Sequence, residues 1–154
     1  MNDMRHTHLF ANVPSKDYLG FWADQTLQAK TVADFMDLDR REVARVAGVS
    51  SASVRWDQKI PREVLDRLTE IAVVCSLVAQ FFEGDVIKTK LWFQTRNPLL
   101  GNLSPRDMIR YGRYEKLRRF VMDALVENGI PVPASVEVRV GDRGSGAPKE
   151  PAAA

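Results

Sequence analysis

The sequence predicts an all-α fold made of two helical halves and a C-terminal tail. Three observations predict this class. Helix-capping residues recur along the chain, apolar residues repeat at helical spacing, and glycine or proline follows where each apolar run ends. At 154 residues, with 45% apolar and 27% charged side chains, the chain has room for one domain or two small ones. We divide it into an extension (1–30), two halves (31–84 and 85–128) and a tail (129–154).

The extension contains an aromatic segment, residues 17–22, which we expect to pack on the body of the protein, as a short helix that reaches Lys30. His6 and His8 have a spacing that a metal accepts, but two ligands in a terminal segment fit a polar tail far better. No apolar stretch of signal-peptide length is present near Met1, and a single cysteine excludes an internal disulfide framework. Both observations fit a protein of the cytoplasm.

Two short helices are predicted at the start of the first half, over residues 31–36 and 39–47. Each begins with a capping box, an oxygen-bearing residue followed three positions later by an acid. The two boxes are Thr31 with Asp34 and Asp39 with Glu42. Gly48 then ends the second helix, because glycine adopts a left-handed conformation at little cost. A third helix, capped by a serine, is predicted over about residues 50–57.

The second and third of these helices have the form of a helix-turn-helix. Ala44 is small where the two helices cross, and valines on both fill the wedge between them. Such a wedge directs the N-terminal residues of the last helix into the major groove of DNA. We expect DNA contacts from Ser50, Ser51, Ser53, Arg55 and Lys59. The alternative is a helical hairpin without a DNA role, and the balance of −2 over residues 1–84 predicts weak binding by a lone monomer.

A long helix is predicted over residues 61–82, ended by Gly84. It is apolar on nearly all sides, so we expect one side to meet the core and another to meet a second domain or a homodimer partner, through residues such as Val74 and Leu77. Its apolar run is far shorter than the roughly 20 residues that span a bilayer, which predicts no membrane contact. Cys75 lies in this run and is expected to be a buried small hydrophobe.

The second half shows an ordered set of turn and capping signals. Three helices are predicted, over residues 85–94, 104–111 and 113–128. A tight turn at residues 97–101 (Asn-Pro-Leu-Leu-Gly) joins the first to the second, Gly112 separates the second from the third, and Gly129 ends the third. Trp92 and Phe93 are expected to pack in the core; a ligand-binding aromatic pair is the alternative.

Positive charge is concentrated in the second half. Residues 85–119 hold nine Lys and Arg against three Asp and Glu, a balance of +6, whereas the whole chain carries +2. Such a basic block favours an acidic partner, protein or nucleic acid, although a solvated helix face is an equal alternative. Once His6 and His8 are discounted, the chain offers neither a Ser-His-Asp nor a Cys-His set, and it has no phosphate-binding loop, so we expect no enzyme and no cofactor.

The tail contains two segments of different composition. Residues 136–140 (Val-Glu-Val-Arg-Val) alternate between apolar and charged, which is typical of a short strand, but a lone strand needs a partner to become ordered. Residues 141–154 are rich in Gly, Pro and Ala, and we expect them to be disordered.

The signals of the second half resemble the C-terminal, toxin-binding domain of the Xre/MbcA/ParS family of antitoxins. The matched residues are Trp92, Asn97, Pro98, Leu99, Gly101, Pro105, Met108, Ile109 and Gly112. With the preceding helices, the resemblance covers roughly residues 31–128. It implies a type II antitoxin whose partner is a RES-domain toxin that consumes NAD. It also implies that the antitoxin blocks the toxin's NAD pocket and that the complex represses its own operon by binding operator DNA.

Carried over by position, the resemblance places toxin binding in residues 85–128 and puts the segment after the last helix near the toxin's pocket. The residues expected to contact the toxin are Arg113, Lys116, Arg119, Ile130 and Val132. The chain departs from the family in its N-terminal extension and in the length of its tail. Two other classes stay open: a stand-alone transcription regulator, and a toxin-binding module whose helix-turn-helix serves only dimerisation.

Overall fold

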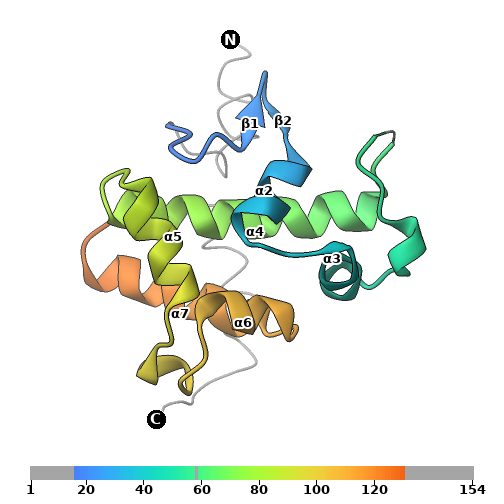
Figure 1. The fold of residues 1–154 in the computed structure, drawn as a ribbon. Helices are drawn as coiled ribbons and strands as arrows, with labels where there is room; N and C mark the ends of the chain where they lie inside the picture. Colours follow the sequence, from blue (N-terminus) through green and yellow to red (C-terminus); the bar gives the residue numbers. More distant parts are fainter. Residues whose placement is uncertain (1–15, 58, 131–154) are drawn as a thin grey trace, which may run out of the picture.

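The computed structural model of this chain describes residues 16–57 and 59–130, drawn as a ribbon in Figure 1. Within these ranges the chain is mostly helical, which confirms the predicted all-α class. The helices are α2 (Ala29–Phe35), α3 (Arg40–Ala47), α4 (Arg62–Phe81), α5 (Val86–Gln94), α6 (Pro105–Arg110) and α7 (Tyr114–Glu127). Two 3-10 turns, η1 (Ser51–Ser53) and η2 (Pro98–Leu100), and one hairpin, β1 (Trp22–Ala23) with β2 (Thr26–Leu27), complete them. The histidine pair, Val132, the predicted strand and the predicted disordered tail lie outside the described residues.

The aromatic segment near the start forms a hairpin, so the predicted short helix is wrong. Strands β1 and β2 pair antiparallel, and the two residues that join them, Asp24 and Gln25, have positive φ angles. A helix cannot continue through that conformation. The carboxylate of Asp17 accepts the backbone N–H groups of Phe21 and Trp22, each at 2.9 Å. This loop directs Phe21 into the core, where it is fully buried.

Helix α2 begins earlier than predicted. Its N-cap is Gln28, which makes no side-chain capping bond, whereas the carbonyl oxygen of Gln28 accepts the N–H of Thr31 at 3.0 Å. Thr31 therefore lies inside the helix, and the capping box assigned to it is wrong. Asp34 instead pairs with Lys30, one turn earlier, at 3.1 Å.

Helix α3 begins and ends as predicted, but the helix expected after it does not form. Asp39 and Glu42 exchange the two hydrogen bonds of a capping box, at 2.8 and 3.0 Å, and Gly48 ends the helix with a φ of 74°. Residues 50–57, all described, hold only the turn η1, after which Val54 is extended. Serine side chains compete with helical hydrogen bonds, and burial of Val54 fixes the extended chain. The predicted helix-turn-helix thus lacks its second helix.

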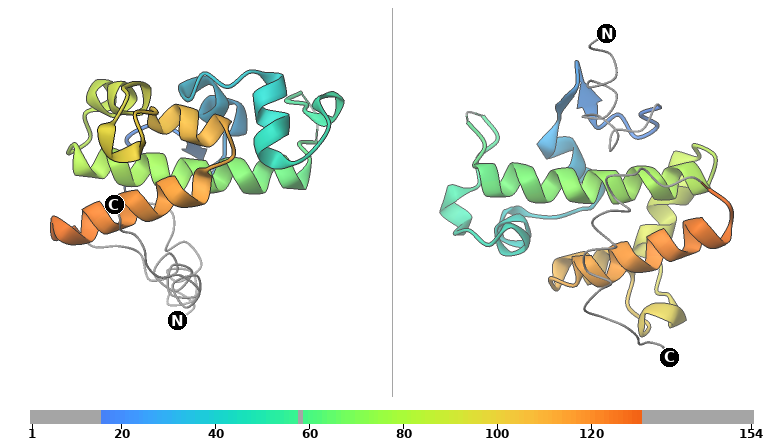
Figure 2. Two further views of the ribbon diagram at one scale, coloured as in Figure 1. Left: turned by 90° about the horizontal axis from the view of Figure 1, so that it is seen from below. Right: turned by 180° about the vertical axis from the view of Figure 1, so that it is seen from behind.

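Helix α4 is the centre of the fold. Figure 2 shows α2, α3, α5 and α6 on one side of α4 and α7 on the other. Every residue of α4 from Ile71 to Ala79 is buried, and Val74 and Leu77 are only 1% and 3% exposed. The apolar pattern of this helix therefore reflects burial within one chain. Our placement of Val74 and Leu77 in a dimer interface is wrong.

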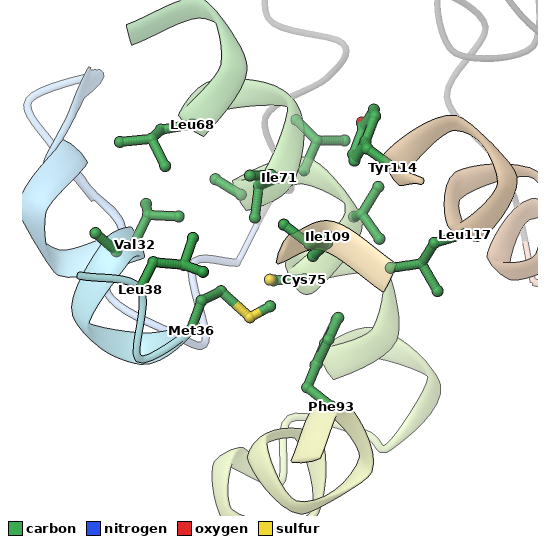
Figure 3. Packing of buried hydrophobic residues seen from close by; sticks show 14 of the residues in the cluster. Val32, Met36, Leu38, Leu68, Ile71, Cys75, Phe93, Ile109, Tyr114 and Leu117 are labelled. Atoms are coloured by element: carbon green, nitrogen blue, oxygen red, sulfur yellow. The ribbon is translucent and has the colours of Figure 1, made fainter. Parts of the chain in front are cut away.

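The buried core runs across residue 84, where we divided the two halves. Figure 3 shows Met36, the C-cap of α2, in one cluster with Ile71 and Cys75 of α4, Phe93 of α5 and Leu117 of α7. Cys75 is fully buried, as expected, and burial raises the pKa of its thiol. None of the helices in the described ranges combines the length and the apolar content needed to cross a bilayer.

Two arginines of α6 add a polar connection between the halves. Arg106 donates to the carbonyl oxygen of Met36 at 2.6 Å and to that of Asp37, both in the turn after α2. Arg110 donates to the carboxylate of Glu42 on α3 at 2.5 Å, and this hydrogen bond raises the pKa of Arg110. Glu42 is thus shared between the cap of α3 and the contact with α6.

Candidate functional site

Three of the motif residues of the second half, Trp92, Asn97 and Leu99, line an apolar groove. It lies between the C-terminal end of α4, the end of α5, the turn η2 and α7, and its volume is about 250 Å³. Among its lining residues only Asn97 is polar; the aromatic ones are Phe81, Phe82, Trp92 and Phe120. A concave apolar surface with few polar groups is typical of a binding site.

The turn at residues 97–101 shapes one wall of this groove. The side-chain oxygen of Asn97 accepts the N–H of Leu99 at 2.9 Å, and its backbone N–H donates to the carbonyl oxygen of Leu103 at 3.0 Å. Gly101 closes the turn with a φ of 70°, a conformation that favours glycine. These hydrogen bonds hold the side chains of the two leucines in different environments: Leu100 is buried in the core, whereas Leu99 is 77% exposed.

Helix α5 divides its two aromatic residues between the core and the groove. Phe93 is buried and meets the ring of Phe35 edge to face, with centroids 6.3 Å apart. Trp92 is half-buried, lies perpendicular to Phe93 at 5.0 Å and lines the groove. The prediction of core packing is therefore confirmed for Phe93, whereas Trp92 both packs on the core and faces the groove.

The rim of the groove carries exposed apolar side chains. Besides Leu99, Phe81 at the end of α4 is 41% exposed. Ile87, on α5, is 80% exposed but does not line the groove. Clustered exposed apolar groups mark interaction surfaces, whereas isolated ones need no explanation. The contrast between Leu99 and Ile87 provides a matched pair for experiments.

The three basic residues predicted to bind a toxin are exposed on α7 or at its start. Arg113 is the N-cap of α7, and Lys116 lies one turn before the groove residue Phe120. Residues four apart share a helix face, so Lys116 continues the stripe that leads into the groove. Arg119 lies on the neighbouring stripe.

Ile130 lies where the chain leaves α7. Its N–H donates to the carbonyl oxygen of Leu125 at 2.9 Å, and its half-buried side chain packs against the core. Leu125 itself lines the groove. Ile130 is therefore close to the groove, although its contact with the core leaves it only partly accessible to a partner.

Only part of the basic block is surface charge. Four of its members have partners within the fold: Lys90 with the carbonyl oxygen of Phe35, Arg106 and Arg110 as described, and Arg118 with Glu115. The other five are exposed: Lys88, Arg96, Arg113, Lys116 and Arg119. The charge count from the sequence therefore overstated the basic surface, because it could not distinguish arginines that connect helices.

The residues predicted to contact DNA lie on η1 and in the loops around it. Ser50, Ser51, Arg55 and Lys59 are exposed and Ser53 is half-buried, with the hydroxyl groups of Ser50 and Ser53 2.9 Å apart. Arg55 lines an open hollow of about 430 Å³ together with Arg40, which we did not predict. The adjacent pair Arg40-Arg41 at the start of α3 is the sequence signal that could have found it.

Comparison with known proteins gives one similarity. No protein-family model matches the chain, and no curated protein matches it. The chain is similar to a chain in the crystal structure of the M. tuberculosis MbcT–MbcA toxin–antitoxin complex, with 26% sequence identity and a TM-score of 0.43. The similarity covers 68% of this chain and 95% of that chain.

Proposed function

We propose that this protein is the antitoxin of a type II toxin–antitoxin system and that it binds a RES-type toxin that consumes NAD. The observation that supports this most is the position of Trp92, Asn97 and Leu99, which match the family motif and line one apolar groove. Residues needed only for packing are buried, but Leu99 is held outward by a hydrogen-bonded turn. A rigidly presented apolar side chain beside a groove fits a protein partner.

The surface around the groove favours a partner of one kind. An apolar side chain of the toxin enters between Phe81, Trp92 and Phe120, and acidic groups of the toxin face the exposed Arg113 and Lys116. Apolar burial at the centre with charged groups at the rim is the usual arrangement of protein interfaces. The charges at the rim contribute mainly to the rate of association and to specificity.

Neutralisation, in this proposal, depends on the chain that follows Asn128. Ile130 and Val132 are its first apolar residues, and they lead toward the NAD pocket of the toxin. The test is the NAD level of cells that express the toxin with the full chain, a chain ending at Val140, or a chain ending at Asn128. We expect the first two to protect equally and the third to protect less. Full protection by the third would place inhibition in the helices.

We also propose that the protein binds its own operator. Arg40 and Arg55 line one hollow, and Ser50 and Ser51 are exposed beside it. Without a second helix to enter the major groove, these groups suit phosphates better than base edges. A homodimer, joined through a surface other than the core of α4, would supply the second contact that a chain with an acidic first half needs.

One experiment separates the proposed function from its alternatives. In this proposal the protein acts in the cytoplasm and needs no cofactor. For the test, it is co-expressed with the product of the neighbouring gene and then purified. A stable complex is the expected result. Specific retardation of promoter DNA without any such complex would instead indicate a stand-alone transcription regulator.

A further inference from the structure

We infer that the apolar groove beside Leu99 is occupied by residues 131–140 of the same chain when no partner fills it. These residues lie beyond the described part of the structure, so the inference rests on where the chain leaves α7, on the lining of the groove and on the sequence that follows. It goes beyond the proposed function, because it concerns the free protein.

The end of α7 delivers the chain to the groove. Gly129 has a φ of 72°, which ends α7, and the N–H of Ile130 donates to the carbonyl oxygen of Leu125 at 2.9 Å. The side chains of Ala124 and Leu125 line the groove. Ile130, the last described residue, therefore lies within about one helical turn of the groove wall, at roughly 5 Å per turn along the axis.

The segment that follows has the composition that such a groove accepts. Val136, Val138 and Val140 alternate with charged residues, so in an extended chain the three valines point to one face and the charges to the other. Pro131 and Pro133 favour an extended backbone. Ten extended residues reach roughly 33 Å, which far exceeds what is needed to lie along a groove that begins beside Leu125.

The attached segment binds the groove in preference to a second copy of the chain. A short flexible tether gives a local concentration of the order of millimolar, and the segment does not lose the translational freedom that a separate molecule would lose. A weak apolar contact is then enough to keep the groove occupied. If the proposed function also holds, a toxin that enters the groove displaces this segment and leaves it free to reach the toxin's pocket.

The test is a disulfide between the segment and the groove in the full-length protein, L99C/V136C. Position 99 is exposed, and the disulfide requires Cα atoms within about 7 Å of each other. The native Cys75 does not interfere, because burial raises the pKa of its thiol and thiol exchange needs a thiolate. The rate of disulfide formation is measured by intact mass under a glutathione redox buffer.

The matched control keeps the tether and removes the apolar contact. V138N/V140N is added to L99C/V136C, which leaves the length and the net charge of the segment unchanged. We expect disulfide formation within one chain, at least tenfold slower with the asparagines. An equal rate in both proteins would mean that the segment meets the groove only by random diffusion. A disulfide that joins two chains would identify a second copy as the occupant. Either result would overturn the inference.

Discussion

Replacing Glu42 by alanine is expected to destabilise the whole described fold, because this one carboxylate joins α3 to α6. It accepts the N–H of Asp39 at 3.0 Å and the guanidinium of Arg110 at 2.5 Å. The side chain of Glu42 is only 12% exposed and that of Arg110 28%, so solvent screens the pair less than an ion pair on the surface. The substitution removes one bond of a helix cap and one charge-assisted contact between the two halves.

The expected decrease in the free energy of unfolding is the sum of these two losses. A helix cap is worth about 1 kcal/mol and a charge-assisted hydrogen bond about 1.5–3 kcal/mol. We therefore expect Glu42→Ala to lower the free energy of unfolding by about 2–4 kcal/mol. Arg110→Ala leaves the cap intact, so a double-mutant cycle between Glu42 and Arg110 isolates the contact between helices, at about 1–2 kcal/mol.

Urea unfolding followed by tryptophan fluorescence measures these differences. For a domain of this size the slope is about 1–3 kcal/mol per molar urea, so the midpoint is expected to fall by about 1–2 M. Glu127→Ala, an exposed acid at the end of α7, is the control and is expected to stay within about 0.5 kcal/mol of the parent. A coupling energy below about 0.5 kcal/mol would refute the connection through Glu42.

Three further outcomes are expected. Burial raises the pKa of the Cys75 thiol, so above about pH 8.5 this thiol loses its proton only in the unfolded chain. The free energy of unfolding of the parent is therefore expected to fall by about 1.4 kcal/mol per pH unit more than that of Cys75→Ala. Equal dependence of the two proteins on pH, measured by urea unfolding, would contradict this. Gly84→Ala is expected to lower the free energy of unfolding by about 1–3 kcal/mol, because φ is +87° and the new Cβ would meet the Tyr18 ring at 2.6 Å. An unchanged midpoint of thermal unfolding would contradict that geometry. Arg55→Ala is expected to weaken promoter binding by about 1 kcal/mol, by the same amount for every DNA sequence, and to leave toxin binding unchanged. Gel shifts measure this, and a loss that depends on the base at one position would show that Arg55 reads a base instead.

Local capping chemistry made much of the fold predictable. Asp39, Asp85 and Ser104 each accept the N–H three residues ahead, as expected, because a cap depends only on nearby atoms. The same reasoning failed at Thr31, where α2 begins earlier at Gln28. The N–H of Gln28 donates to the carbonyl oxygen of Phe21 at 2.7 Å, so α2 starts directly after the hairpin, which we did not predict from the sequence.

The candidate site was only partly accessible from the sequence. The resemblance singled out Trp92 and Leu99, but the groove also needs Phe81 from α4 and Phe120 from α7, which only the packing of the helices brings there. Conversely, the pattern of serines after Gly48 predicted a helix that the burial of Val54 prevents. Motif residues were thus found, whereas the surface that they form depended on the tertiary structure.

The claim that the groove binds the toxin is tested most directly by comparing Leu99→Asp with Ile87→Asp. The two side chains are 77% and 80% exposed, so neither substitution is expected to change stability by more than about 0.5 kcal/mol. Calorimetric titration with the toxin measures the affinity of each. We expect Leu99→Asp to weaken binding about thirtyfold or more, since an anchor residue contributes about 2 kcal/mol, and Ile87→Asp to bind as the parent does. Equal affinities for the two variants would contradict the assignment of the groove as the toxin-binding surface.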